Sequence, residues 1–386
     1  MRFVVVGDPE GKRTGFFQAA LQSSGLPAAD VLSWADFLAE PARLEAAVEG
    51  GQGPVGLRIE SFGKSFPAQR ALLVRGAEAD LGSAPLLSAE EARVLPEERG
   101  RIRGLRQAHE GFRWALGRIS QLLESRPALR VRNPPRAIEL MFDKPACHAA
   151  CAAAEVSVPP SLGGVSSYED LRTKMRLASF KRVFVKPAHA SSASGVIGLA
   201  SDGRDRLAAY TSVELVEEQG EVRLYNSRKI RRYTDERQIA TIVDALAPER
   251  LHVEAWIPKA KLPNAAGEAM ACDLRCVVIG GRAQHSVVRT SKSPLTNLHL
   301  KNPRGELSAF QEWLGPSRFQ ELLSACEDAT RAVGPTLYAG VDICVAKGLR
   351  EFAVLEVNAF GDLLPRVEVS GRDTYAAEIA AFLEAA

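Results

Sequence analysis

Residues 340–358 read GVDICVAKGLREFAVLEVN, two alternating apolar runs separated by a turn-like segment. The alternation over Val341–Val345 and Val354–Asn358 predicts the two strands of a hairpin. If this hairpin is symmetric about Leu349, Asp342 lies directly opposite Glu356. The period of two then gives the hairpin an apolar face, made of Val341, Ile343, Val345, Leu355 and Val357, and a polar face, made of Asp342, Glu356 and Asn358.

Two carboxylates that face each other across paired strands repel and need a compensating partner. A divalent cation is one solution, because the oxygens of Asp, Glu and Asn suit Mg²⁺, which usually takes its remaining ligands from water and nucleotide phosphates. A solvated face with a nearby lysine or arginine is the other. The ending Glu356-Val357-Asn358 favours the metal.

A second segment, residues 183–196, reads VFVKPAHASSASGV. A buried strand here delivers Lys186 to its end, and a loop of small residues follows. Small side chains allow backbone N–H groups to approach phosphate oxygens, and the lysine adds a point charge. The loop residues expected at the phosphate are Ser191, Ser192, Ser194 and Gly195.

Two further strands carry weaker signals. Residues 253–258 (VEAWIP) could present Glu254 and backbone groups to an adenine edge, although a strand that ends at proline needs no ligand. Residues 273–281 (DLRCVVIGG) predict a strand and a tight hairpin turn at the glycine pair. Arg275 and Arg289 on this hairpin could clamp a phosphoryl group, or Arg275 could form a surface salt bridge with Asp273.

The other parts of the chain carry strand and helix signals that predict the elements around these motifs. Strand signals at 2–6, 54–59 and 71–74 alternate with helix signals at 15–24 and 35–48, which predicts a small parallel α/β unit. Helical patterns follow at 96–129 and 138–154. The early glycine segment at 7–14 lacks the spacing of a phosphate loop and is expected to be a strand-to-helix turn.

Composition limits the functional class. The 386 residues exceed a typical domain about two and a half times, so two or three compact units are expected. Lysine and arginine number 49 against 47 acidic residues, a balance that argues against dedicated nucleic-acid binding. No apolar run is long enough to span a membrane. Six scattered cysteines without an export signal predict reduced thiols and a cytoplasmic location.

The order of these motifs resembles the ATP-grasp superfamily, in the branch that contains the ribosomal-protein glutamate ligase, glutathione synthetase and D-alanine–D-alanine ligase. The resemblance spans roughly residues 133 to 365, over half of the chain. The matching segments, in order, are 142–144 (FDK), 158–159 (VP), 185–187 (VKP) with its small-residue loop, 254–257 (EAWI), 273–275 (DLR), 296–299 (TNLH), 340–342 (GVD) and 356–358 (EVN).

This resemblance implies a mixed α/β and α+β protein with the ATP-grasp fold: a Rossmann-like parallel α/β domain over residues 1–132, a central lobe over 133–257 and a C-terminal lobe over 258–386, with ATP between the two lobes. Lys144 and Lys186 would contact phosphates. Glu254 and the backbone of Ile257 would hold adenine. Mg²⁺, or alternatively Mn²⁺, would be bound by Asp342, Glu356 and Asn358, while Arg275, Arg289 and Asn297 would stabilise the transferred phosphate. The sequence departs from the family at Ala190, where a glycine is usual, and at Ala255, where the residue is often polar.

The implied activity is ADP-forming ligation of a carboxylate to an amine or thiol through an acyl-phosphate. The carboxylate's partner would be an amino acid or a peptide. A small-molecule kinase and a non-catalytic ATP-binding regulatory module are the alternatives, and a homo-oligomeric state is left open. The residues expected to contact substrate are Arg58, Glu60, His299 and Arg304.

Overall fold

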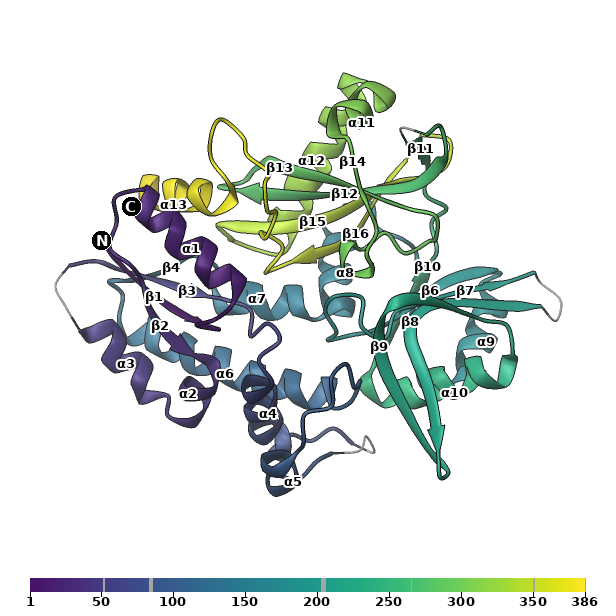
Figure 1. Ribbon diagram of the computed structural model, residues 1–386, viewed down its shortest axis with the longest axis horizontal. Helices are drawn as coiled ribbons and strands as arrows, with labels where there is room; N and C mark the ends of the chain where they lie inside the picture. Colours follow the sequence, from purple (N-terminus) through teal and green to yellow (C-terminus); the bar gives the residue numbers. More distant parts are fainter. Residues whose placement is uncertain (51–52, 83–85, 203–205, 265, 350, 386) are drawn as a thin grey trace.

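A computed structural model of the chain describes residues 1–50, 53–82, 86–202, 206–264, 266–349 and 351–385. Within these residues the strands form three sheets, one in each third of the chain (Figure 1). The division of the chain into units at 1–132, 133–257 and 258–386 stays a prediction.

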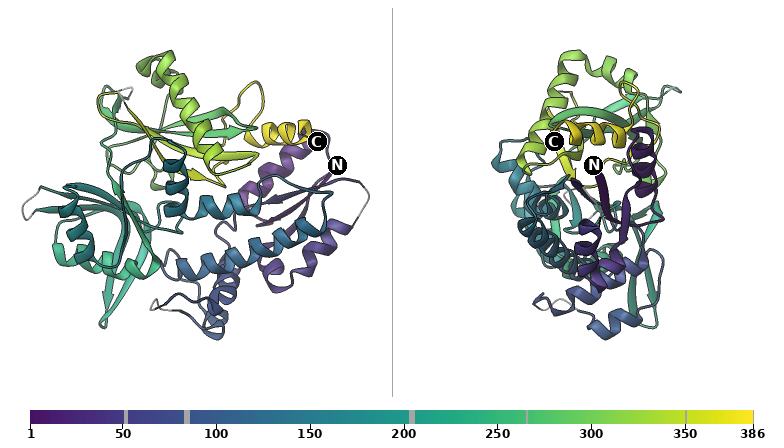
Figure 2. Two further views of the ribbon diagram at one scale, coloured as in Figure 1. Left: turned by 180° about the vertical axis from the view of Figure 1, so that it is seen from behind. Right: turned by 90° about the vertical axis from the view of Figure 1, so that its left-hand side faces the viewer.

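The N-terminal sheet is parallel, in the order β2 (Asp30–Ser33), β1 (Arg2–Gly7), β3 (Val55–Ile59) and β4 (Leu129–Val131). Side chains of β1 alternate between two cores. Phe3 and Val5 pack with α1 (Lys12–Ser23) and with the last helix, α13 (Thr374–Glu384). Val4 and Val6 face the other core, which includes residues of α2 (Trp34–Ala39), α3 (Ala42–Glu49), α4 (Phe66–Arg75) and α6 (Leu105–Ser125). The chain thus returns to its first sheet, and both termini lie close together (Figure 2).

Three sequence predictions in the first half of the chain are wrong. Residues 71–74 belong to α4 and not to a strand, because Ser65 caps a helix there that contacts α6. The expected helix over 35–48 is two helices, α2 and α3, which Glu40 and Pro41 separate. The expected helix over 138–154 is also two, α7 (Pro135–Phe142) and α8 (Lys144–Ala153), because Asp143 adopts an extended backbone and caps α8 through the backbone N–H of Ala146 (3.0 Å).

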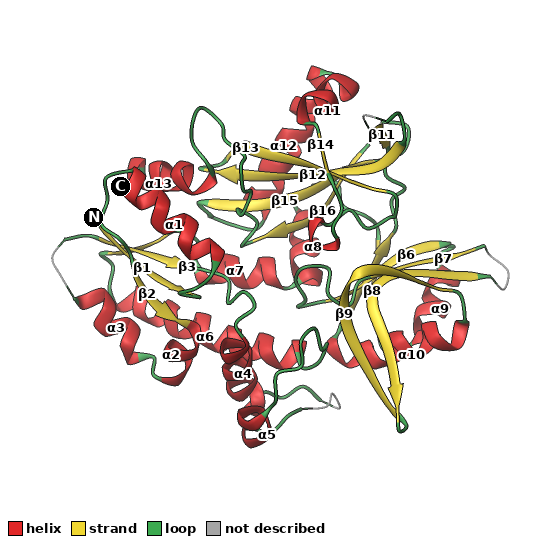
Figure 3. Cartoon of the chain, in the orientation of Figure 1, coloured by secondary structure: helices red, strands yellow, loops and turns green. Residues whose placement is uncertain are grey.

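The central sheet is antiparallel, and α9 (Tyr168–Leu177) and α10 (Glu236–Leu246) pack on it. Its strand order is β5 (Ser161–Val165), β10 (Leu251–Ala255), β6 (Arg182–Pro187), β7 (Ile197–Ser201), β8 (Leu207–Glu218) and β9 (Glu221–Tyr233). The long hairpin of β8 and β9 projects from the sheet (Figure 3), and Tyr225 on β9 forms a bridge with Arg101, before α6. The 3₁₀ turn η1 (Gly76–Glu78) and the short helix α5 (Ala89–Val94) connect α4 to α6 within the first unit, and a second 3₁₀ turn, η2 (Ala247–Glu249), precedes β10.

The C-terminal sheet is antiparallel, in the order β14 (Arg304–Gly305), β13 (Arg282–Ser291), β12 (Ala269–Ile279), β15 (Tyr338–Val345) and β16 (Phe352–Asn358), and β11 (Lys261–Pro263) pairs with β12. Helices α11 (Leu307–Leu314) and α12 (Pro316–Ala332) cover one face. The turn between β12 and β13 uses Gly280 and Gly281 with φ of 59° and 77°, as the glycine pair predicts.

The register of the last hairpin follows the sequence prediction at its decisive pair. Asp342 lies opposite Glu356. Beyond that pair the register shifts by one, so that Ile343 faces Val354. Val354 consequently joins the hydrophobic core with Val357, and Leu355 instead lines a cleft. The expectation that Leu355 lies on the apolar face is therefore wrong, because a β-bulge reverses the alternation.

Two findings concern membrane-spanning helices and cysteines. Among the described residues, no helix has both the length and the apolar composition that a membrane span requires. The six cysteines are all free and buried.

Candidate active site between the two lobes

The C-terminal sheet has a polar face built from four neighbouring strands, β13, β12, β15 and β16. Arg275 on β12 lies opposite Asp342 on β15, which in turn lies opposite Glu356 on β16. Arg289 on β13 lies opposite Asp273, two residues before Arg275. Because side chains directly opposite each other share a face, charged groups that are far apart in sequence meet here.

Cations and carboxylates alternate along this face in what we call the charge chain, Lys259–Asp273–Arg289–Asp342–Arg275. Lys259 Nζ lies 2.7 Å from Asp273 Oδ2, and Arg289 Nε lies 2.6 Å from Asp273 Oδ1. Arg289 Nη1 lies 3.0 Å from Asp342 Oδ1, and Arg275 Nη2 donates to Asp342 Oδ2 at 2.8 Å. Burial alone would raise the pKa of Asp342, but Arg275 and Arg289 outweigh it and hold the pKa below its usual value.

Glu356 has a different partner from Asp342. Lys144, the first residue of α8, places its Nζ 3.2 Å from Glu356 Oε1 and also donates to the backbone carbonyl of Ala190. Asn358 donates through Nδ2 to the carbonyl of Gly340 (3.2 Å). Each carboxylate of the facing pair thus has a cationic partner, and the three predicted metal ligands share one face of the hairpin.

A cleft opens beside Glu356, between the lobes. Lys186 and Glu254 form an ion pair within it. Burial acts to raise the pKa of Glu254, yet the Lys186 ammonium keeps the pKa below its ordinary value. The cleft is narrow, with about 20 Å³ of space open to water-sized molecules. Its lining combines charged and apolar side chains: Met141, Lys144, Cys147, His148, Cys151, Val158, Lys186, His252, Glu254, Val354, Leu355, Glu356 and Val357.

The loop after β6 lies next to Lys144. Ser192, Ala193 and Gly195 have positive φ (55°, 59° and 71°), so the loop turns sharply. Ser191 and Ser192 are exposed, and Ser194 and Gly195 lie deeper. The φ of Ala190 is not positive, and its carbonyl accepts the hydrogen bond from Lys144. The conformation at Ala190 therefore does not require the glycine that is usual in the family.

The other predicted residues are spread around this centre. Ile257 is half-buried just after β10, and Ala255 ends that strand. Asn297 precedes the 3₁₀ turn η3 (Leu298–Leu300) and accepts a hydrogen bond from Asn302 Nδ2 through its carbonyl (3.1 Å). His299 and Arg304 are exposed.

Two predicted substrate residues do not line the cleft. Arg58 and Glu60 are 0% and 1% exposed, and they belong to a buried ionic group that we call the buried cluster: Arg58, Glu60, Asp362 and Glu378. Arg58 lies 2.8 Å from Glu60, 2.5 Å from Asp362 and 2.7 Å from Glu378. The prediction that Arg58 and Glu60 contact substrate is wrong in this structure, because β3 directs both side chains into the interface with α13.

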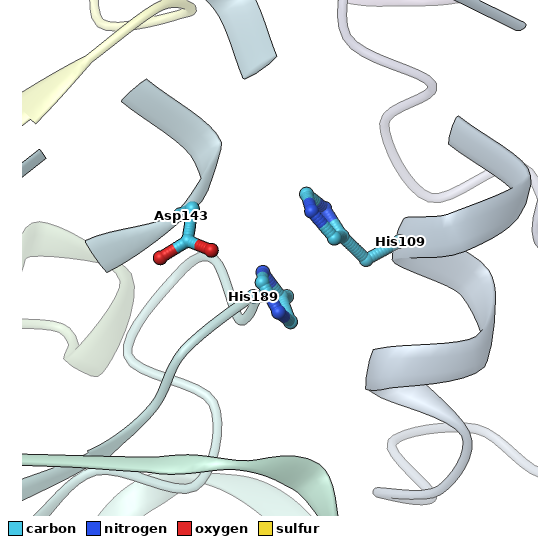
Figure 4. Close-up of side chains that lie close together, drawn as sticks. All are labelled: His109, Asp143 and His189. Carbon is cyan, nitrogen blue, oxygen red and sulfur yellow. The ribbon is translucent and has the colours of Figure 1, made fainter. Parts of the chain in front are cut away.

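A second group of polar side chains joins the N-terminal unit to the central lobe. His109 on α6 stacks on His189, with ring centroids 3.6 Å apart and an interplanar angle of 8° (Figure 4). Burial lowers the pKa of each imidazole to about 3. Asp143 lies close enough for all three to approach one ion, with ligand atoms within 4.8 Å of one another.

The geometry of this group favours packing over coordination. Asp143 already receives hydrogen bonds from Arg250 Nη1 (2.7 Å) and from the backbone N–H of Ala146. The lone pairs of parallel rings do not converge on one point. The stack therefore acts as a contact that holds the start of the loop at 189–195 against α6.

Sequence reasoning missed Lys259, His109 and the cysteines and histidines of the cleft. Cys147 and Cys151 lie on α8, and their position beside the cleft depends on how α8 packs. Lys259 follows the strand that ends at Pro258, and no local pattern connects it with Asp273. These contacts arise only when segments that are far apart in the sequence pack together.

No known family model matches the sequence, and no curated protein matches it. Solved structures do resemble the fold. The ATP-grasp ligase PsnB complexed with minimal precursor, Mg and ADP has a TM-score of 0.51 at 17% identity, over 98% of this chain and 97% of that one. D-alanine–D-alanine ligase from Bacillus anthracis complexed with ATP has a TM-score of 0.53 at 13% identity, over 100% and 96%. D-cycloserine synthetase DcsG has a TM-score of 0.53 at 13% identity, over 99% and 100%.

Proposed function

Starting from the ATP-grasp fold that this chain shares with those structures, we propose that it is an ATP-dependent ligase that joins a carboxylate to an amine. The observation that carries the proposal is the meeting of Lys144, Lys186, Glu254 and Glu356 in one cleft beside the charge chain. Two lysines suit a polyphosphate, and the apolar wall with Glu254 suits a purine base.

The residues around Glu356 fit a magnesium ion. Asp342, Glu356 and Asn358 offer hard oxygen ligands on one face, and the Glu356 side chain keeps 27% of its surface exposed. When bound, the ion would supply charge neutralisation at the nucleotide phosphates. Complexes of PsnB with Mg and ADP support the use of both by a protein of this fold.

Each step of the proposed reaction has residues available for it. The substrate carboxylate would attack the terminal phosphoryl group of ATP, forming an acyl-phosphate and releasing ADP. The amine would then attack the acyl carbon and expel phosphate. Arg275 and Arg289, with Asn297, would stabilise the charge that develops on the transferred group, and no protein nucleophile is needed.

The acceptor class is also a proposal. PsnB is described in complex with a minimal precursor, and D-alanine–D-alanine ligase acts on an amino acid by its name. A peptide or amino acid is accordingly the amine that we propose here. His299 and Arg304, both exposed, remain the proposed substrate contacts.

Mass spectrometry with ATP, Mg²⁺ and pooled amino acids and peptides tests the activity. A ligase gives ADP together with an amide product whose mass is the sum of its parts less water. A phosphorylated product without an amide would instead identify a kinase. Nucleotide binding with no ADP would identify a regulatory module.

A Lys186→Met variant tests the cleft itself. We expect this change to abolish nucleotide binding, because it removes the cation that neutralises Glu254 and would contact the phosphates. Thermal stabilisation by a nonhydrolysable ATP analogue with Mg²⁺ is the measurement. Wild-type stabilisation in the variant would remove Lys186 from the site.

A further inference from the structure

The connection between the two lobes carries a lysine whose side chain is turned inward. Lys259 lies between β10 and β11, and its side chain is only 8% exposed. The connecting segment is fixed to β15: Lys259 forms a bridge with Ala346, and the backbone N–H of Ala260 donates to Val345 (2.8 Å). Lys259 is therefore held in place by its backbone as well as by its charge.

The Lys259 ammonium occupies one side of a buried carboxylate. Nζ donates to Asp273 Oδ2 and to Thr296 Oγ1, both at 2.7 Å. Thr296 also donates to the same carboxylate oxygen. Asp273 Oδ1 is left for Arg289 Nε alone. Each oxygen of Asp273 thus has its own donors.

This division of Asp273 controls how Arg289 is presented. A guanidinium beside a free carboxylate prefers a bidentate pair, which uses two nitrogens on two oxygens. Lys259 and Thr296 block that arrangement by occupying Oδ2. Arg289 consequently contacts Asp273 through Nε and directs Nη1 to Asp342.

We propose that Lys259 is a positioning residue that keeps the Arg289 guanidinium directed at the reaction centre by occupying the second oxygen of Asp273. The inference rests on the proposed function, in which Arg289 stabilises the transferred phosphoryl group. It also links the lobes, because Ile257, the proposed adenine contact, lies two residues before Lys259 on the same segment.

Loss of the lysine has a directional consequence. Without Lys259, Arg289 turns to a bidentate pair with Asp273 and leaves Asp342, whose charge is then neutralised by Arg275 alone. Stabilisation of the phosphoryl group falls, whereas the attraction of Asp342 for a dication does not. A change in kcat without a higher Mg²⁺ requirement is the signature of this rearrangement, and general loss of structure would worsen both.

The test compares Lys259→Met with Lys261→Met, an exposed lysine on β11 outside the proposed site. We expect Lys259→Met to lower kcat about tenfold or more, which corresponds to roughly 1.4 kcal/mol or more in the barrier. The KM for ATP and the half-saturating Mg²⁺ concentration should stay within about twofold, and Lys259→Arg should recover part of kcat. Lys261→Met should behave as wild type.

Two results would overturn the proposal: an unchanged kcat in Lys259→Met, or a joint deterioration of kcat, KM for ATP and Mg²⁺ requirement. If Lys259→Met does not fold, Thr296→Val replaces it. This change removes one of the two donors to Asp273 Oδ2, so a smaller fall in kcat with the same unchanged Mg²⁺ requirement is expected.

A measurement independent of activity separates this inference from the proposed function. Absence of stabilisation of the wild type by Mg²⁺ and an ATP analogue would contradict the proposed function. The link itself is then tested by a double-mutant cycle of Lys259→Met and Arg289→Met in urea unfolding. If the losses in unfolding free energy of the two single variants do not add up to the loss in the double variant, the two residues are linked through Asp273. Additive losses would contradict the link.

Discussion

The charge chain and the buried cluster are made of the same residue types but serve different ends. In the buried cluster the side chains of Arg58, Asp362 and Glu378 are 0% exposed, and the cations and carboxylates pair with one another. In the charge chain the Arg275 side chain is 19% exposed, and the neighbouring Glu356 and Lys144 are 27% and 13% exposed. Asp342 and Arg289 are only 4% and 6% exposed, so the second group is open to a ligand at its edge, where Glu356 and Lys144 line the cleft.

The two groups are joined by a short loop. Asn358 ends β16 beside the charge chain, and Asp362 enters the buried cluster four residues later. Arg13 on α1 donates to the carbonyl of Phe360 within this loop and pairs with Asp362. Gly340 and Gly361 lie so close that a Cβ on Gly340 would come within 2.4 Å of the Gly361 Cα. The buried cluster therefore fixes the position of the loop that follows the proposed metal ligands.

The comparison first predicts what happens when two of the proposed metal ligands beside the charge chain are removed. The double change Glu356→Ala and Asn358→Ala should reduce Mg²⁺-dependent turnover to background, because two of three proposed ligands are lost, while the fold persists. Steady-state ADP release and circular dichroism are the measurements. Glu351→Ala, on the exposed turn of the same hairpin, is the control, and full activity in the double variant would refute the metal assignment.

The opposite outcome, a loss of stability with little change in turnover, is expected when the buried cluster is changed. Arg58→Met leaves Glu60, Asp362 and Glu378 without their shared cation, and breaking a buried ion pair costs about 3–5 kcal/mol. Urea unfolding should register this loss in the free energy of unfolding. Turnover per folded molecule should change little, and a stability loss below about 1 kcal/mol would mean that the cluster is not structural.

A third change separates catalysis from binding within the charge chain. Arg289→Met should lower kcat about a hundredfold, the usual effect of losing one donor to a developing charge, roughly 3 kcal/mol. Nucleotide binding should persist, because Lys144 and Lys186 are unaffected. Loss of analogue binding together with kcat would place Arg289 in ground-state recognition instead.

At neutral pH the smallest expected effect concerns the interface at His109 and His189, where both imidazoles are already neutral. Their folded pKa values of about 3 lie below the ordinary 6.5, so the unfolded chain binds more protons between those values. Stability contributed by the neutral stack is complete above pH 6.5 and is lost as the pH falls toward 3, by up to about 1.4 kcal/mol per pH unit for each histidine. His109→Phe keeps an aromatic ring and should make the unfolding free energy less dependent on pH in this window. An unchanged pH dependence would show that His109 does not titrate as described.

Local sequence patterns predicted much of the fold and part of the candidate site. The Asp342–Glu356 pairing followed from alternation and turn position, and the glycine pair at 280–281 marked its own hairpin. Leu355 was misplaced because a one-residue bulge has no sequence signature here. Residues 71–74 look like a strand in isolation, and only contact of α4 with α6 explains their helix. Arg58 and Lys259 show why the rest of the site could not be predicted from the sequence. The burial of a side chain and the residue it pairs with depend on how segments distant in the sequence pack together.

A structure determined with Mg²⁺ and a nonhydrolysable ATP analogue tests the central claim most directly. The account predicts one ion bound by oxygens of Asp342, Glu356 and Asn358, at about 2.0–2.1 Å from its direct ligands and in contact with the nucleotide phosphates. Lys144 would then turn from Glu356 towards the phosphates. An analogue bound elsewhere, with Asp342 still paired to Arg275 and no ion among the three side chains, would contradict it.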